Sequence, residues 1–224
     1  MISPEKNKQI LRFLIFLTAE IYIFYLIISK IIHSGKPFSE IWLWVNPVIV
    51  IYLLDLYFLY QGVKQKPKEI DTRLSSVIIG FFGLFGFSIT FFTIAMYDFP
   101  SIQTQFFITL KTVGACLSFI PYPIIILALL TLKKCCTIVP EAISVVKTGI
   151  YRYSRHPLYV AYIVWYFSYI LIFPNPVIAL ICITNIIMLV LRYRREEEIL
   201  LRNFPDYREY YKQTGLFPVP VFKK

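Results

Sequence analysis

The 224-residue sequence is poor in the residues that build metal centres and disulfide frameworks. It has two histidines and four cysteines, without the paired Cys and His spacings that hold zinc. Cys116 and Cys182 lie inside apolar runs, and the adjacent Cys135 and Cys136 favour interfacial packing in a reducing compartment over lipidation. The eight glycines form no G-x-G-x-x-G loop. We therefore expect no metal site, no disulfide scaffold and no Rossmann-type domain.

Charged residues are also scarce, at 16%, against 58% hydrophobic residues and a mean hydropathy of +0.65. Four apolar runs have the length of roughly 20 residues that crosses a bilayer as a helix. We expect a single integral membrane domain over 1–224, an all-α polytopic transmembrane bundle whose last two spans form a tight helical hairpin around Pro174–Pro176. The expected spans, about six in all, are 10–32, 41–62, 75–97, 109–132, 158–173 and 177–193.

Twenty of the 23 lysines and arginines fall on one side of this arrangement. The positive-inside rule then places both termini and the segment 133–157 in the cytoplasm. The net charge of +10 thus describes one membrane face, attracted to anionic lipid, and nucleic acid is a poor partner for it. The pattern fits a bacterial inner membrane and an endoplasmic reticulum membrane equally.

Two acidic residues and three glycines stand out inside the apolar runs. Glu20 and Asp55 lie near the middle of the first two spans, where a charged side chain costs about 2.5–3.5 kcal/mol or more. A functional role and a protonated carboxyl hydrogen-bonded to a tyrosine remain equally open for both. The tyrosines in reach are Tyr22, Tyr52 and Tyr57, and the glycines, Gly80, Gly83 and Gly86, indicate close helix packing.

The hairpin brings two charged clusters to one level. Arg155 and His156 precede the turn by nearly the same number of residues as Glu196 and Glu197 follow it, so both clusters reach the same membrane face. Cations at a helix start and glutamates at a helix end each oppose the helix dipole, and each cluster is stabilised beside the other. A simple headgroup anchor is the alternative. Both signs of charge, a helix start and surrounding tyrosines instead favour a site for a zwitterion.

The segments "TGIYRYSRHPLYVAY" and "RYRREEEILLRNFPDYREYYKQTGLFP" resemble the signature of the isoprenylcysteine carboxyl methyltransferase and phospholipid methyltransferase superfamily of integral membrane enzymes. The resemblance covers about 143–220. It implies that 133–224 binds S-adenosylmethionine and that 1–132, the first four spans, selects the acceptor. The residues that it implies for cofactor binding are Gly149, Tyr151, Arg155, His156, Pro157, Tyr159 and Glu197, and the catalytic candidates are Arg192 and Glu196. Glu198 extends the acidic run, so the register of the glutamate pair is open.

The resulting expectation is methyl transfer from S-adenosylmethionine to an amphipathic or lipid-linked acceptor, isoprenylcysteine carboxylate-like in the first place. A carboxylate or thiolate acceptor would need Arg192 as an orienting cation, and an amine acceptor would need a base such as Glu196 or Glu197. One alternative is a nicotinamide-dependent membrane reductase of related fold. Another is a non-enzymatic transporter or lipid-binding membrane protein that uses Glu20 and Asp55.

Overall fold

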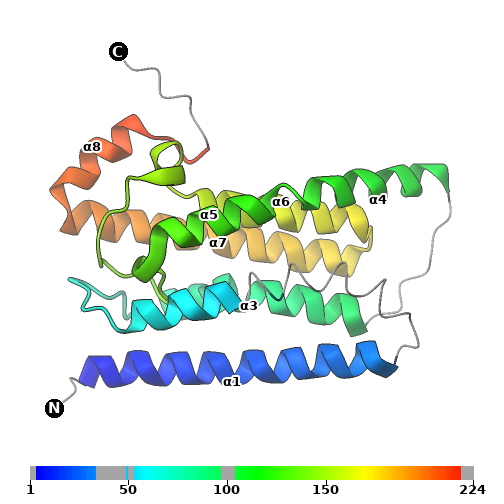
Figure 1. The fold of residues 1–224 in the computed structure, drawn as a ribbon, viewed down its shortest axis with the longest axis horizontal. Helices are drawn as coiled ribbons and strands as arrows, with labels where there is room; N and C mark the ends of the chain where they lie inside the picture. The colour runs from blue at the N-terminus through cyan, green and yellow to red at the C-terminus, as the bar shows by residue number, and fades with distance from the viewer. Residues whose placement is uncertain (1–3, 34–48, 50–52, 97–103, 218–224) are drawn as a thin grey trace.

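The computed structural model describes residues 4–33, 49, 53–96 and 104–217, and these are helical apart from short connections (Figure 1). The expectation of an all-α fold is confirmed for them, since the backbone pairing of Ile70 with Glu141 is an isolated bridge and not a strand. Residues 53–63 are also helical. The named elements are α1 (Pro4–His33), α3 (Leu74–Met96), α4 (Gln105–Ser118), α5 (Pro121–Leu132), η1 (Lys133–Cys135), η2 (Gly149–Arg152), α6 (Pro157–Ile172), α7 (Pro176–Asn203) and α8 (Pro205–Gln213).

Proline marks the beginning of four consecutive α-helices, α5 to α8. Its fixed φ suits the first helical turn, and its missing N–H would have no partner there. The turn between α6 and α7 uses the same device, with Asn175 Oδ1 accepting a hydrogen bond from Val177 N at 2.8 Å. The expected C-terminal hairpin is therefore confirmed, and its two arms pack against each other.

The helices form successive layers. α1 packs against α3, α3 packs against α7, and α6 packs against α4, α5 and α7, as Figure 1 shows. The three glycines of α3 lie at close approaches: a Cβ at Gly80 would lie 2.5 Å from Ile138 O, and one at Gly86 would lie 2.5 Å from Asn185 Oδ1. The expected role of these glycines in close packing is confirmed.

The membrane-spanning capacity of the described residues is smaller than expected. Gln105–Leu132, which joins α4 and α5, and α7 are long and apolar enough to cross a bilayer. α3 adds a third candidate if its halves, which meet at 48°, count as one span. The apolar stretches of α1 and α6 are shorter, and 16 residues of α6 rise only about 24 Å against a hydrocarbon core of about 30 Å. The count of two to three does not reach the expected six, and half of 41–62 lies outside the described residues.

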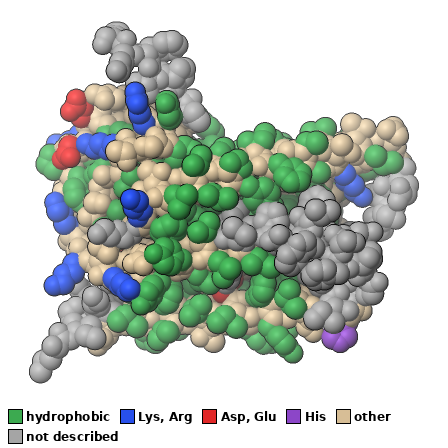
Figure 2. All heavy atoms as spheres, in the orientation of Figure 1, with side chains coloured by type: hydrophobic (Ala, Val, Ile, Leu, Met, Phe, Trp, Pro, Cys, Tyr) green, Lys and Arg blue, Asp and Glu red, His purple; other side chains and the backbone are tan. Residues whose placement is uncertain are grey.

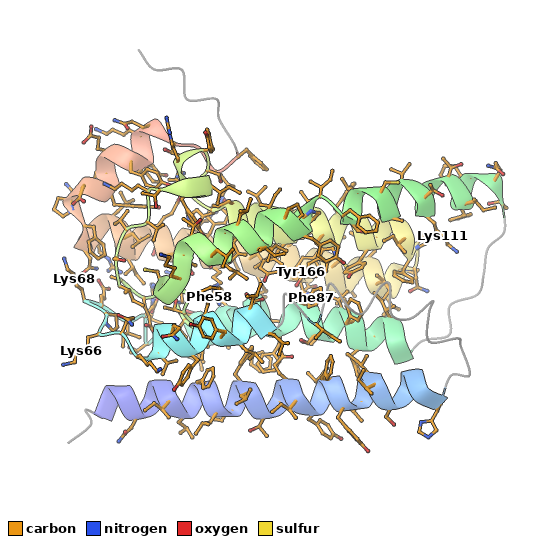
Figure 3. All side chains as sticks on the ribbon, in the orientation of Figure 1. Phe58, Lys66, Lys68, Phe87, Lys111 and Tyr166 are labelled. Carbon is orange, nitrogen blue, oxygen red and sulfur yellow. The ribbon has the colours of Figure 1, made fainter. Side chains whose placement is uncertain are left out.

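Charged side chains gather at the end of the bundle that carries α8 (Figure 2). We call it the basic end; it consists of 64–73, 133–157 and α8. Figure 3 places Lys66 and Lys68 there and Lys111 at the opposite end. Backbone hydrogen bonds join the first two segments, from Lys68 N to Ala142 O at 2.8 Å and from Asp71 N to Pro140 O at 3.0 Å. The last membrane span was expected to end at 193, with the glutamates at the end of the same helix; α7 continues to Asn203 at this end, because its charged residues are good helix formers.

Candidate active site at the basic end

The segment ahead of α6 is shaped by one glycine and one proline. Gly149 opens η2 at φ +58°, a conformation that glycine adopts without strain. A side chain there would also lie 2.9 Å from Thr131 Oγ1. His156 then precedes Pro157, the first residue of α6, and no side chain caps this helix start. The free N–H groups of the first turn can therefore bind an acceptor or an anion.

The two charged clusters of the hairpin meet as expected. Glu197 Oε1 accepts a hydrogen bond from Arg155 Nε at 2.7 Å and lies 3.2 Å from His156 Nε2. Glu197 and His156 are buried, at 8% and 5% exposure. Because the ion pair is almost free of water, it fixes the start of α6 against the cytoplasmic half of α7.

A second network lies one turn away on α7. Glu196 Oε1 accepts a hydrogen bond from the Tyr159 hydroxyl at 2.5 Å and lies 3.3 Å from Arg192 Nε. Arg192 Nε also donates to the Tyr159 hydroxyl oxygen at 2.8 Å. Glu198 points outward, is paired with Arg195 and has a side chain that is 54% exposed. Glu196 and Glu197 are therefore the two glutamates that contact residues of the first arm of the hairpin, whereas Glu198 does not face them.

Arg192 is held by backbone oxygens on its outer edge. Its Nη1 donates to Gly80 O at 3.2 Å and to Ile138 O at 2.9 Å, and its Nη2 donates to Thr137 O. The side chain passes Gly83, where a Cβ would lie 2.9 Å from Arg192 Cδ. Arg192 thus fastens α7 to α3 and to the segment after α5. Few of its donors are left for a ligand.

The C-terminal segment covers the same end. Arg155 Nη1 donates to the backbone oxygens of Tyr211, at 3.0 Å, and of Thr214, and its guanidinium lies 4.1 Å from the centre of the Tyr211 ring. The Tyr210 hydroxyl donates to Tyr151 O, and Ser154 Oγ donates to Leu216 O. Arg155 therefore joins α6, Glu197 and the C-terminal segment.

A pocket of about 1320 Å³, its open mouth included, lies between these networks. Tyr207 of α8 lines it, is 2% exposed, and its hydroxyl has no hydrogen-bond partner among the described residues. Burial raises the pKa of Tyr207 well above its usual value, and it raises the pKa of Tyr210 to about 12. Both phenols stay protonated at neutral pH. The Tyr207 hydroxyl is thus an unsatisfied buried donor of a residue that lines the pocket.

Six of the nine residues expected at the site line this pocket, and three do not. The lining residues are Tyr151, Arg155, His156, Tyr159, Arg192 and Glu196. Gly149 and Pro157 shape the backbone beside the pocket. Glu197 does not line it, but contacts the lining residues Arg155 and His156.

Sequence reasoning missed other lining residues. Tyr207 and Tyr210 lie in the aromatic tail, and Cys136 and Asp55 join the pocket only through the fold. Tyr162, one of the tyrosines expected around the charged clusters, also lines the pocket. Burial raises the pKa of the Cys136 thiol, which leaves it an inert packing residue, as the sequence favoured. No group of His, Cys, Asp and Glu within the described ranges is arranged to hold a metal ion.

The two acidic residues inside the apolar runs have partners from distant helices. Glu20, 1% exposed, accepts a hydrogen bond from Ser88 Oγ at 2.5 Å. Asp55 Oδ2 accepts one from the Tyr162 hydroxyl at 2.6 Å. Neither donor is among the tyrosines expected from the sequence, and Tyr52 lies outside the described residues. Of the two carboxylates, Asp55 lines the pocket.

Comparison with known families gives a match over the part of the chain that builds the hairpin. Residues 124–202 match the isoprenylcysteine carboxyl methyltransferase (ICMT) family. The match confirms the resemblance to this family and supports a membrane methyltransferase in general. It contains both charged clusters of the hairpin and ends before α8, so Tyr207 and Tyr210 lie beyond it. None of the curated proteins compared with the chain matches it.

Proposed function

We propose that the protein is an integral membrane enzyme that transfers a methyl group from S-adenosylmethionine to an amphipathic or lipid-linked acceptor. The observation that carries the proposal is one pocket that combines the ICMT-family hairpin with an unpartnered buried donor, the Tyr207 hydroxyl. The expected six spans, cytoplasmic termini and division into an acceptor region, 1–132, and a cofactor region, 133–224, belong to this proposal. The pocket is lined from both regions, which supports that division.

The groups around the pocket fit S-adenosylmethionine. The Tyr207 hydroxyl and the uncapped start of α6 offer donors for a carboxylate or a ribose hydroxyl. The Glu196 carboxylate and the Tyr159 and Tyr162 rings suit an ammonium or a sulfonium. Bound there, the cofactor would supply an electrophilic methyl group.

The protein's own residues then act by positioning and by excluding water. Arg155, His156 and Glu197 hold the start of α6 in place, and the ordered C-terminal segment restricts water at the basic end. Arg192 orients Tyr159 and Glu196. Glu196 is the carboxylate bonded to Tyr159 and Arg192 and can accept a proton, so it remains a catalytic candidate.

Calorimetry on detergent-purified protein tests the proposal. We expect S-adenosylmethionine to bind in the micromolar range, and we expect His156→Ala and Glu197→Gln to abolish binding. Glu198→Gln is the matched control, because Glu198 points away from the pocket and should leave binding unchanged. A well-folded wild type that fails to bind S-adenosylmethionine would refute the proposal. Binding of a reducible nicotinamide would then favour the reductase, and substrate flux lost in Glu20→Gln would favour the transporter.

A further inference from the structure

The pocket extends from the basic end into the apolar interior of the bundle. Its deeper wall includes Phe16 of α1, Phe87 and Ser88 of α3, and Tyr166 of α6. Figure 3 shows Phe87 and Tyr166 in the interior, together with Phe58. Apolar side chains dominate this wall, so it suits a hydrocarbon chain rather than the polar parts of a nucleoside.

Asp55 is the acidic residue of this deeper part. It comes from the helical residues 53–63 and is bonded to Tyr162, which lies five residues after Pro157, or about 7.5 Å along α6 from the helix start. Asp55 is partly buried beside apolar walls, and a carboxylate in such surroundings is stabilised by a proton, a cation or several donors. The Tyr162 hydroxyl is a neutral donor and supplies a single hydrogen bond.

The cations that line the pocket are already paired. Arg155 is paired with Glu197, and Arg192 with Glu196. The Nη1 group of Arg192 donates its hydrogen bonds to backbone oxygens. Among the described residues no Lys or Arg forms an ion pair with Asp55, although Arg192 acts on it electrostatically over a longer distance. The carboxylate therefore has no cation from the described part of the chain in direct contact.

We propose that Asp55 and Tyr162 form the subsite for the reacting group of the methyl acceptor, and that this group is a protonated amine carried on an apolar chain. The inference rests on the proposed function and names the acceptor class for the same pocket. The ammonium donates to the Asp55 carboxylate. One N–H bond breaks, its electron pair stays on nitrogen as a lone pair, and the proton forms an O–H bond with Asp55. The neutral amine is then nucleophilic.

A carboxylate acceptor fits this subsite poorly. Two carboxylates at this partly buried position repel each other, so a carboxylate acceptor binds only when one of the pair takes up a proton, whereas an ammonium is attracted without that cost. Arg192 would have to orient the carboxylate, but its outer donors are bound to the oxygens of Gly80, Thr137 and Ile138. The isoprenylcysteine carboxylate expected from the sequence is therefore the less suitable acceptor.

Three ligands with one hydrocarbon chain test the inference. Dodecylamine, dodecanol and dodecanoate are titrated by calorimetry into the whole protein in a nonionic detergent, with saturating S-adenosylhomocysteine and with a micelle blank. The variant is Asp55→Asn, which keeps the shape of the side chain and removes its charge. Glu198→Gln is the control, because it removes one exposed carboxylate from the same protein.

We expect the wild type to bind dodecylamine most tightly and dodecanoate least tightly. Asp55→Asn should weaken dodecylamine by about 10-fold or more and leave dodecanol unchanged, because a hydrogen bond between charged groups is lost. Glu198→Gln should leave dodecylamine unchanged. Tighter binding of dodecanoate than of dodecylamine, or equal losses in both variants, would overturn the inference. The ranking on the wild type needs no variant, so it decides the matter even where Asp55→Asn does not fold.

Titration of S-adenosylhomocysteine alone separates this inference from the proposed function. No binding of S-adenosylhomocysteine to the wild type contradicts the methyltransferase, whatever the amine does. Binding of S-adenosylhomocysteine without a preference for the amine contradicts only the acceptor subsite. A 10-fold loss of S-adenosylhomocysteine binding in Asp55→Asn would assign the carboxylate to the cofactor and also overturn the inference.

Discussion

Two tyrosines of α8 provide a matched pair in which the same change should have opposite effects. Tyr207 and Tyr210 are both buried, at 2% and 7% exposure, on one short helix. The Tyr210 hydroxyl donates to Tyr151 O and, at 3.3 Å, to Ser154 O. The Tyr207 hydroxyl has no partner among the described residues. Substitution with phenylalanine removes a satisfied hydroxyl in one case and an unsatisfied one in the other.

The expected magnitudes follow from these environments. An unsatisfied buried polar group costs about 1–3 kcal/mol, so Tyr207→Phe should raise the free energy of unfolding by about 1 kcal/mol or more. Tyr210→Phe removes a hydrogen bond and leaves the carbonyl oxygen of Tyr151 without this donor. It should therefore lower the free energy of unfolding by about 1–2 kcal/mol. For a chain of this size each 1 kcal/mol corresponds to about 2–4 °C in the melting temperature.

In the presence of the cofactor, Tyr207→Phe should have an unfavourable effect, in contrast to its stabilising effect on the free protein. If its hydroxyl donates to S-adenosylmethionine, Tyr207→Phe weakens binding by about 10-fold, which equals about 1.4 kcal/mol. Thermal melting of detergent-purified protein, with and without S-adenosylmethionine, measures both quantities. The variant should be more stable than the wild type alone and should gain less from the cofactor. A lower melting temperature without cofactor, or an unchanged gain with it, would refute the reasoning.

Three further predictions concern the interior and the basic end. Glu197→Gln should lower the free energy of unfolding by about 2–4 kcal/mol, because it breaks a buried ion pair, whereas Glu198→Gln should change it by less than about 1 kcal/mol; melting curves compare the two. Gly86→Ala should lower the melting temperature by several degrees, since its new Cβ would lie 2.5 Å from Asn185 Oδ1; an unchanged melting curve would contradict the close packing. The Arg73 guanidinium, with Ser76, holds the pKa of Asp71 below its usual range, so the stability that it provides is present above about pH 4 and lost as the pH falls further. A denaturation series across this range should show a steeper acid loss for the wild type than for Asp71→Asn.

The local part of the site could be predicted from the sequence, because it depends on one hairpin. Counting helical rises on both sides of the turn predicted that Arg155 and His156 would meet the glutamates, and Glu197 contacts both. The choice between Glu196 and Glu198 could not be predicted, since a shift of two residues changes which face of a helix a side chain occupies. The contacts of Glu196 with Arg192 and Tyr159 place its side chain on the face that lines the pocket.

The deeper part of the pocket could not be predicted, because its contacts join helices that lie far apart in the chain. Asp55 meets Tyr162 across 107 positions, and Glu20 meets Ser88 across 68. Sequence reasoning could identify these carboxylates as costly, but it considered only tyrosines near them in the chain. The packing of α3 between α1 and α7 creates the contact of Glu20 with Ser88, and the packing of the helical residues 53–63 near α6 creates that of Asp55 with Tyr162.

The two parts of the pocket differ in the charged and polar groups that they offer to a ligand. At the basic end the charged side chains are bonded to one another and to backbone oxygens, which leaves the Tyr207 hydroxyl and the start of α6 as donors without a side-chain partner in the described part of the chain. Farther in, apolar walls lie around Asp55, which forms no ion pair with a Lys or Arg of the described residues. A polar cofactor is stabilised only at the first position, and an apolar chain only at the second. The proposed cofactor and acceptor would therefore lie end to end along one pocket, and their reacting groups would meet between Tyr159 and the Asp55–Tyr162 pair.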